Sequence, residues 1–149
     1  MNINTRDFGI VQVEEDAVFV FDDGLYGFEE SKQFAVFERA IDDDISFLYL
    51  QSTDNEIPCF LVFEPWDLHP DYKPVLSPED LRLCQVDCID DLIFLVIANV
   101  SSTIENLSIN IKSPVVLNPK TRKARQVVLK NPDYTVRYFP FQKDGKAGA

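Results

Sequence analysis

The chain has 149 residues and a formal net charge of −11, and 46% of its residues are hydrophobic while 26% are charged. This composition is typical of a folded globular protein and excludes an intrinsically disordered chain. The length predicts one domain, which we place at residues 1–142, followed by a small, polar and frayed tail at residues 143–149.

The charge is unevenly divided along the chain. Residues 1–111 contain 5 Lys and Arg against 23 Asp and Glu, a net charge of −18, whereas residues 112–149 contain 9 against 2, a net charge of +7. An acidic body repels nucleic acid and attracts basic proteins over a range that salt shortens. Alternatively, the acidic body pairs with the basic C-terminal region of the same chain and does not attract a partner.

The N-terminus is acidic and aromatic where a secretory signal needs a basic start and an apolar core, and no apolar run approaches the 20 or so residues of a membrane span. We therefore expect a cytoplasmic protein without a membrane anchor. Cys59, Cys84 and Cys88 are an odd number for a disulfide set, and His69 is the only histidine available to join them as a zinc ligand. We expect no metal and no cofactor.

The first half of the chain predicts short strands separated by turns. The segments rich in β-branched and aromatic residues lie at 8–13, 17–21, 34–38, 46–51 and 59–63. The first two are predicted to form a hairpin. A loop at 22–30 contains Gly24 and Gly27, which adopt positive φ without steric cost, and Asp42, Asp43 and Asp44 predict an acidic turn.

A proline-rich segment at 65–78 follows and is predicted to be irregular. Long structured loops of this kind are often functional. Trp66 within it is either a core plug or an exposed binding anchor. Ser77 followed by Pro78 and two acidic residues predicts the start of one short helix that ends near Leu83.

The uncharged run at 92–100 predicts a strand that is covered on both faces. Further strands are predicted at 105–111, where Leu107, Ile109 and Ile111 share one face, and at 115–117, 126–129 and 135–139, with a basic turn at 118–124. This pattern predicts an all-β protein, a small antiparallel β-barrel or sandwich with one short helix.

The sequence contains neither a nucleophile motif beside its histidine nor a calcium-binding loop. His69 has no Gly-x-Ser-x-Gly nucleophile motif to accompany it, and the aspartates at 42–44 lack the alternate spacing of a calcium-binding loop. We therefore predict that the protein is not an enzyme.

Five short motifs follow one another in an order that resembles one known family. Gly24-Leu25-Tyr26-Gly27-Phe28-Glu29 is similar to the Gly-Leu-Pro-Gly-Phe-Glu loop of the FliW family of flagellar assembly factors, with Tyr26 in place of proline. The other motifs are 50–52 around Gln51, 60–65 ending at Pro65, 108–118 with Asn110, Pro114 and Asn118, and 126–129 beginning at Gln126. The resemblance extends over residues 8–140.

The resemblance implies a small β-barrel-like protein without catalytic activity that binds two proteins in turn. One partner is flagellin, and the other is CsrA, a basic RNA-binding repressor of flagellin translation. The resemblance implies that FliW captures CsrA as an allosteric antagonist when flagellin is exported, so that translation resumes. We expect a free monomer that makes no direct contact with nucleic acid.

Charge and loop position predict which residues face CsrA: Asp42, Asp43, Asp44, Glu64, Trp66, Asp67, Asp71 and Tyr72. The motif residues are predicted to have structural roles, with Phe28 as a plug: Gly24, Gly27, Phe28, Gln51, Pro65, Asn110, Pro114, Asn118 and Gln126. The alternative function is an acidic β-barrel domain that binds a small ligand in its interior. A large pocket would favour this alternative, and a filled interior would count against it.

Overall fold

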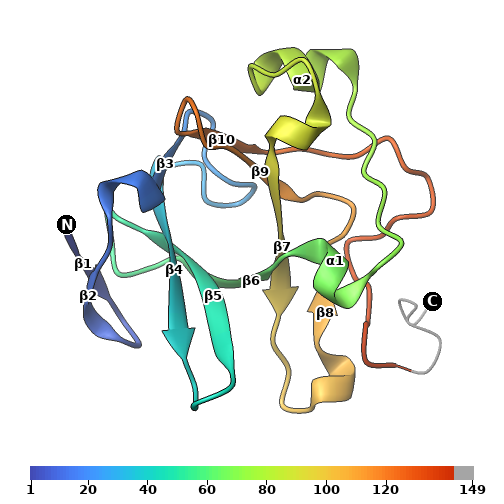
Figure 1. Ribbon diagram of the computed structural model, residues 1–149. Helices are drawn as coiled ribbons and strands as arrows, with labels where there is room; N and C mark the ends of the chain where they lie inside the picture. The colour runs from blue at the N-terminus through green and yellow to red at the C-terminus, as the bar shows by residue number, and fades with distance from the viewer. Residues whose placement is uncertain (143–149) are drawn as a thin grey trace.

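The computed structural model describes residues 1–142, and its main feature is a sheet that closes on itself (Figure 1). The tail predicted at 143–149 lies outside the described residues. The strands of this sheet are β3 (Val18–Phe21), β4 (Gln33–Ala40), β5 (Ser46–Ser52), β6 (Cys59–Phe63), β7 (Ile93–Asn99), β8 (Ser108–Ile109), β9 (Val115–Asn118) and β10 (Lys123–Gln126).

The strand order is β6-β5-β4-β3-β10-β9-β7-β8, and pairing of β6 with β7 closes a barrel of seven strands with β8 attached outside. The predicted all-β barrel with very little helix is therefore confirmed. One pairing departs from the antiparallel prediction: β10 runs parallel to β3, with Lys123 opposite Val20 and Ala124 opposite Phe21. This pairing joins segments about 100 residues apart, and no local sequence pattern encodes it.

The barrel interior is filled by side chains from every one of its strands. Eight of these side chains are at most 4% exposed: Phe19, Phe21, Phe34, Leu50, Val62, Leu95, Val115 and Leu117. Alternate residues of a strand point to opposite faces of a sheet, so six of the seven strands supply one or two of them, and β10 supplies Ala124, which is 7% exposed. The filled interior counts against the alternative function of a small ligand bound inside the barrel.

Strand β7 is covered on both faces, as its sequence predicts. Leu95 packs in the barrel interior, while Phe94 and Val96 pack in a second cluster on the outside. This outer cluster also contains Leu107, Ile109 and Ile111, which confirms that these three residues share one face. It is covered by α1 (Pro65–Leu68), α2 (Pro78–Leu83) and parts of the segment 127–138.

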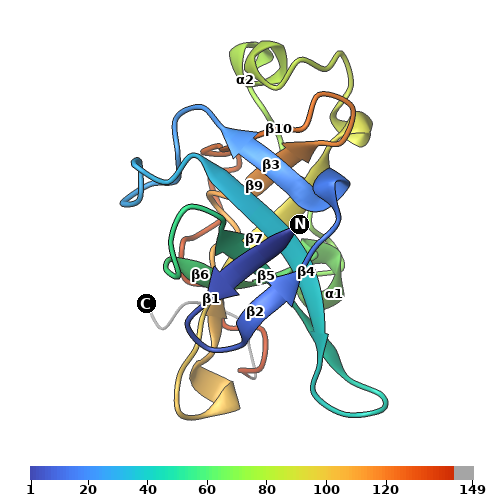
Figure 2. The same cartoon turned by 90° about the vertical axis from the view of Figure 1, so that its left-hand side faces the viewer.

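The N-terminal strand pairing predicted from the sequence is wrong. β2 (Gly9–Gln12) pairs with β1 (Asn2–Thr5), a strand that the sequence analysis missed, and β3 pairs with β4 and β10. Figure 2 shows this two-stranded hairpin lying across β4 and β5. It buries Ile3 and Val11 against Phe37, which forms a third apolar cluster.

The remaining differences are shifts of short elements. The strand predicted at 126–129 lies instead at Lys123–Gln126, and 135–139 contributes only an isolated bridge between Tyr138 and Ile109. Within 65–78, the predicted irregular segment contains the one-turn helix α1. The predicted helix is confirmed as α2, since the Ser77 hydroxyl oxygen accepts a hydrogen bond from the Asp80 N–H. Three 3₁₀ turns complete the described chain: η1 (Glu15–Ala17), η2 (Ile89–Asp91) and η3 (Ile104–Asn106).

Candidate protein-binding surface

The β4–β5 hairpin projects from one end of the barrel, as the β7–β8 connection also does, and it carries the acidic turn at its tip (Figure 1). Asp42, Asp43 and Asp44 are all exposed there. One carboxylate oxygen of Asp42 accepts hydrogen bonds from the N–H groups of Asp44 and Ile45, both at 2.9 Å. The turn is therefore held by Asp42, and Asp43 and Asp44 are left to face solvent.

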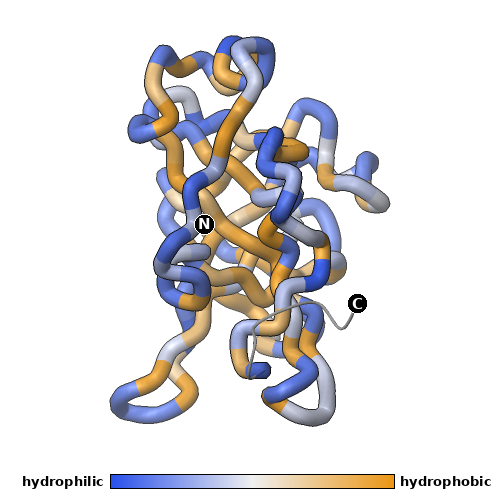
Figure 3. Tube along the Cα trace, turned by 90° about the vertical axis from the view of Figure 1, so that its right-hand side faces the viewer, coloured by the Kyte–Doolittle hydropathy of each residue, from blue (hydrophilic) through white to orange (hydrophobic). Residues whose placement is uncertain are grey.

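In Figure 3 the barrel strands are mainly hydrophobic and the loops mainly hydrophilic.

Glu38 connects this turn to the acids near α1. It lines a hollow with Asp42, Asp43 and Asp44 on one side, and it lines a second hollow with Glu64 and Asp67 on the other. The second hollow is floored by apolar side chains, including Leu48, Val62 and an edge-to-face pair of Phe47 and Phe63 with ring centroids 6.2 Å apart. We call the six acids of the two hollows the acidic surface: Glu38, Asp42, Asp43, Asp44, Glu64 and Asp67.

No member of the acidic surface forms an ion pair with any residue in 1–142. Two of the four ion pairs in residues 1–142 join Asp22 to Lys123 and Asp23 to Arg125 at the β10 side of the barrel, and the other two are local pairs in the N-terminal hairpin and in α2. Part of the basic region therefore pairs with the acidic body, while the carboxylates of the acidic surface have no cationic partner within residues 1–142. Unpaired acids around an apolar floor suit a basic protein partner.

The sequence analysis missed Glu38, although a signal for it was present. Phe34 and Val36 pack in the barrel interior, and Glu38 lies two residues further along the same face of β4. An acid near the end of the inward face of a strand predicts a charged barrel mouth. Its proximity to Glu64 and Asp67 depends on the pairing of β5 with both β4 and β6.

Trp66 lies between the two roles predicted for it. Its indole N–H donates a hydrogen bond to the Tyr72 carbonyl oxygen at 2.8 Å, and its ring packs edge-to-face against Tyr72 and Phe94. The side chain is nevertheless 44% exposed and lines a groove with Pro74, Ile89 and other residues. This groove is distinct from the acidic surface.

Tyr72 is buried, which counts against its predicted role in partner binding. It is 2% exposed, and its hydroxyl donates a hydrogen bond to the Ile111 carbonyl oxygen at 2.8 Å. Burial raises the pKa of this phenol far above its usual value. Asp71 beside it is exposed but lines neither of the two acidic hollows.

The glycine loop adopts the conformation that its sequence predicts. Gly24 and Gly27 have φ of +66° and +86°, and an isolated bridge joins Leu25 to Phe28. Leu25 is the buried plug of this loop at 2% exposure. Phe28 is 43% exposed and only packs edge-to-face on Phe60, so its prediction as a plug is corrected.

The polar motif residues serve as hydrogen-bonding anchors. The buried amide of Gln51 donates to the carbonyl oxygens of three nearby residues, and Asn110 accepts from the Ser113 N–H. Asn118 donates to the Cys84 carbonyl oxygen at 2.9 Å. Gln126 accepts from the Tyr26 N–H and donates to the Ser113 carbonyl oxygen. Both bonds are 3.0 Å long. Pro65 and Pro114 are buried.

Within residues 1–142, no group of three or more His, Cys, Asp or Glu residues is arranged to hold a metal ion. Burial raises the pKa of Cys59 to about 11 and also raises the pKa of Cys84, so both thiols remain protonated near neutral pH. In the same range, none of the helices has the length and apolar character needed to cross a membrane.

Comparison with known proteins gives consistent matches. The chain matches the FliW protein family over residues 2–140. It is 33% identical to the flagellar assembly factor FliW of Syntrophus aciditrophicus over 138 residues, which cover 93% of this chain and 86% of that protein. The FliW of Thermoanaerobacter pseudethanolicus is 32% identical over 138 residues, with 93% and 91% covered. A crystal structure of the flagellar assembly factor FliW aligns with a TM-score of 0.83 and 28% identity, covering 96% of this chain and 99% of that one.

Proposed function

This chain belongs to the FliW family of flagellar assembly factors, and on that premise we propose that it regulates flagellin synthesis by binding flagellin and the repressor CsrA in turn. The family is one of assembly factors and not of enzymes. Flagellin occupies the protein while it is plentiful in the cytoplasm. Export of flagellin frees the protein to capture CsrA, and translation resumes.

Mass action is sufficient for this switch. Two partners that cannot be bound at once exchange according to their free concentrations, and export lowers one of these concentrations. The protein needs no covalent chemistry and no cofactor. Its requirement is a rigid surface that is ready to bind, which a closed barrel with a filled core supplies.

The observation that supports this proposal is the acidic surface. Its six carboxylates lie in two adjacent hollows, one of which has an apolar floor, and none of them is paired with a cation within residues 1–142. A basic RNA-binding protein is attracted to such a surface, whereas RNA is repelled. We assign Asp43, Asp44, Glu64 and Asp67 to the surface that faces CsrA, with Glu38 added to them.

The test is charge reversal on the acidic surface. We expect Asp43→Lys combined with Asp67→Lys to weaken CsrA binding at least about tenfold, equivalent to about 1.4 kcal/mol, because both substitutions place like charges opposite a basic partner. Affinity is measured by titrating purified protein against CsrA at several salt concentrations. Wild-type binding is expected to weaken as salt rises.

Asp87→Lys provides the control because Asp87 is an exposed acid that lines neither acidic hollow and follows α2 closely in the sequence. The helix α2 lies at the opposite end of the molecule from the β4–β5 hairpin tip (Figure 1). The control substitution changes the net charge by the same amount per site and is expected to leave the affinity nearly unchanged. A loss of affinity per substituted site that is as large for Asp87→Lys as for the Asp43→Lys and Asp67→Lys double variant would show that only net charge matters, and it would remove the acidic surface from the proposal. Flagellin and CsrA recovered together in one complex would contradict alternating binding.

A further inference from the structure

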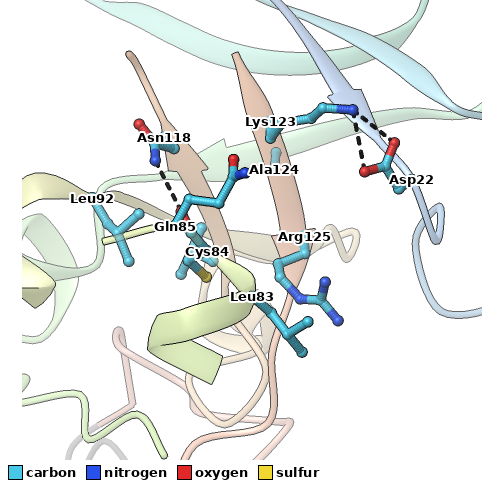
Figure 4. A pocket seen from close by; sticks show the side chains of 10 residues that line it. Asp22, Leu83, Cys84, Gln85, Leu92, Asn118, Lys123, Ala124 and Arg125 are labelled. Atoms are coloured by element: carbon cyan, nitrogen blue, oxygen red, sulfur yellow. Dashed lines mark hydrogen bonds and ion pairs between the residues drawn. The ribbon is translucent and has the colours of Figure 1, made fainter. Parts of the chain in front are cut away.

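A second concave site lies at the other end of the barrel, between the end of α2 and the outer face of β9 and β10 (Figure 4). It encloses about 100 Å³. Its apolar lining includes Leu92, Val116 and Ala124, while its polar groups come from β9, β10, the residues that follow α2 and the loop after β3. In a concave site of this kind, a few polar side chains fix the orientation of a bound ligand.

The first notable polar group is the guanidinium of Arg125. One of its terminal nitrogens pairs with Asp23 at 3.2 Å, but its Nε is buried and has no hydrogen-bond partner within residues 1–142. A buried donor without an acceptor is costly, and such groups in native proteins call for a specific explanation. An acceptor atom in the adjacent cavity would supply the missing partner.

The second group is the side chain of Gln85, which Figure 4 shows between Asn118 and Ala124. Gln85 directly follows the helix end at Cys84 and has a φ of +63°. This left-handed position after a helix is normally occupied by glycine or asparagine, because a longer side chain adds strain. A strained glutamine whose amide lines a cavity is consistent with a binding role for that amide.

The third group is Lys123, whose ammonium forms bonds of 2.9 and 3.2 Å with the two carboxylate oxygens of Asp22. Asp22 also lines the cavity and is largely exposed. An exposed ion pair of this kind contributes little to stability and exchanges readily with another carboxylate. The structure therefore already contains one carboxylate bound at the edge of the cavity.

We propose that this cavity is a binding site for a carboxylate group, held by Lys123, Arg125 and the amide of Gln85. Asp22 acts as an internal competitor for Lys123. A cavity of about 150 Å³ holds benzene, so about 100 Å³ accommodates a carboxylate with a few carbons but excludes a larger organic molecule. The carboxylate comes either from a free small acid or from an acidic side chain or chain end of a bound peptide.

The first experiment is an NMR titration that follows the side-chain amide signals of Gln85 and Asn118. The probes are acetate, acetamide at the same concentrations, an amidated peptide with a single glutamate, and a neutral peptide with a free C-terminus, all at constant ionic strength. Acetate or one of the two peptides is expected to cause saturable shifts, and the probe that binds most tightly identifies the source. Shifts of equal size with acetamide, or saturation with none of the probes, would overturn the proposal.

Variants separate this site from general attraction to positive charge. Arg125→Gln is expected to weaken carboxylate binding about tenfold or more, and Asp22→Asn to strengthen it several-fold because the competitor is removed. The matched control is Lys120→Gln. Lys120 is exposed in the turn between β9 and β10 and does not line the cavity. Equal loss in Lys120→Gln and Arg125→Gln, or no gain in Asp22→Asn, would overturn the assignment.

Discussion

Gly24 and Gly9 have nearly the same backbone conformation, with φ of +66° and +65°, but different surroundings. A Cβ atom added to Gly24 would lie 2.5 Å from the Cα and 2.7 Å from the carbonyl oxygen of Glu29. A Cβ added to Gly9 would have no atom within 4 Å. The two positions therefore separate the cost of the left-handed conformation from the cost of a close backbone contact.

We predict that Gly9→Ala lowers the free energy of unfolding by about 1–2 kcal/mol, the cost of a left-handed alanine. Gly24→Ala is expected to lower it by roughly a further 1–3 kcal/mol, because backbone atoms cannot move aside as a side chain can. Denaturant unfolding of both variants measures the difference. Equal losses would show that the loop relaxes freely and that the close contact does not constrain it.

At the scale of elements, one side chain joins three segments of the chain. Gln126 in β10 binds the Tyr26 N–H of the glycine loop and the Ser113 carbonyl oxygen before β9, and 100 residues separate it from Tyr26. Since Tyr26 replaces the proline typical of the family motif, its N–H is available to make a bond that proline could not make. Gln126 thus fixes the position of the loop.

We predict that Gln126→Ala increases the exchange rate of the Tyr26 amide hydrogen and lowers the free energy of unfolding by about 1 kcal/mol. Hydrogen exchange followed by NMR measures the first effect, and denaturant unfolding measures the second. Gln12→Ala is the control because Gln12 is an exposed glutamine in β2. Unchanged exchange at Tyr26 would show that the loop is held by the packing of Leu25 alone.

Elements defined by local patterns could be predicted from the sequence, and pairings between distant segments could not. The apolar run of β7 and the Ser77 cap of α2 each depend on a few neighbouring residues, and both are confirmed. β1 was missed because Asn2 and Asn4 make it largely polar, and the pairing of β2 was misassigned because a hairpin with the next segment was assumed.

The candidate site follows the same division. Asp42, Asp43 and Asp44 were recognised because they are adjacent in the sequence, whereas Glu38 joins Glu64 and Asp67 only through the β4–β5–β6 pairing. Tyr72 was assigned to the surface because it lies in the proline-rich loop near acidic residues. It is instead buried in the outer apolar cluster, where its hydroxyl binds the carbonyl oxygen of Ile111, 39 residues away.

At the scale of the whole molecule, the negative charge lowers the stability of the fold but raises the affinity for a basic partner. The chain has a net charge of −11, and the structure shows four ion pairs within residues 1–142. Acids that repel one another destabilise the folded state, while the same acids attract a basic partner. Screening by salt therefore relieves the first effect and weakens the second.

We predict that raising NaCl from about 10 mM to about 150 mM increases the melting temperature of the free protein, because the Debye length falls from roughly 30 Å to roughly 8 Å. Over the same range the affinity for a basic partner decreases. Thermal unfolding and a binding titration in identical buffers measure both effects, and KCl at equal ionic strength should reproduce them if screening is the cause. A melting temperature that falls with salt would show that attraction between the basic C-terminal region and the acidic body outweighs the repulsion. If the affinity for the partner does not change with salt, the acidic surface is not the main binding site. Apolar contacts, such as the exposed face of Trp66, would then account for binding.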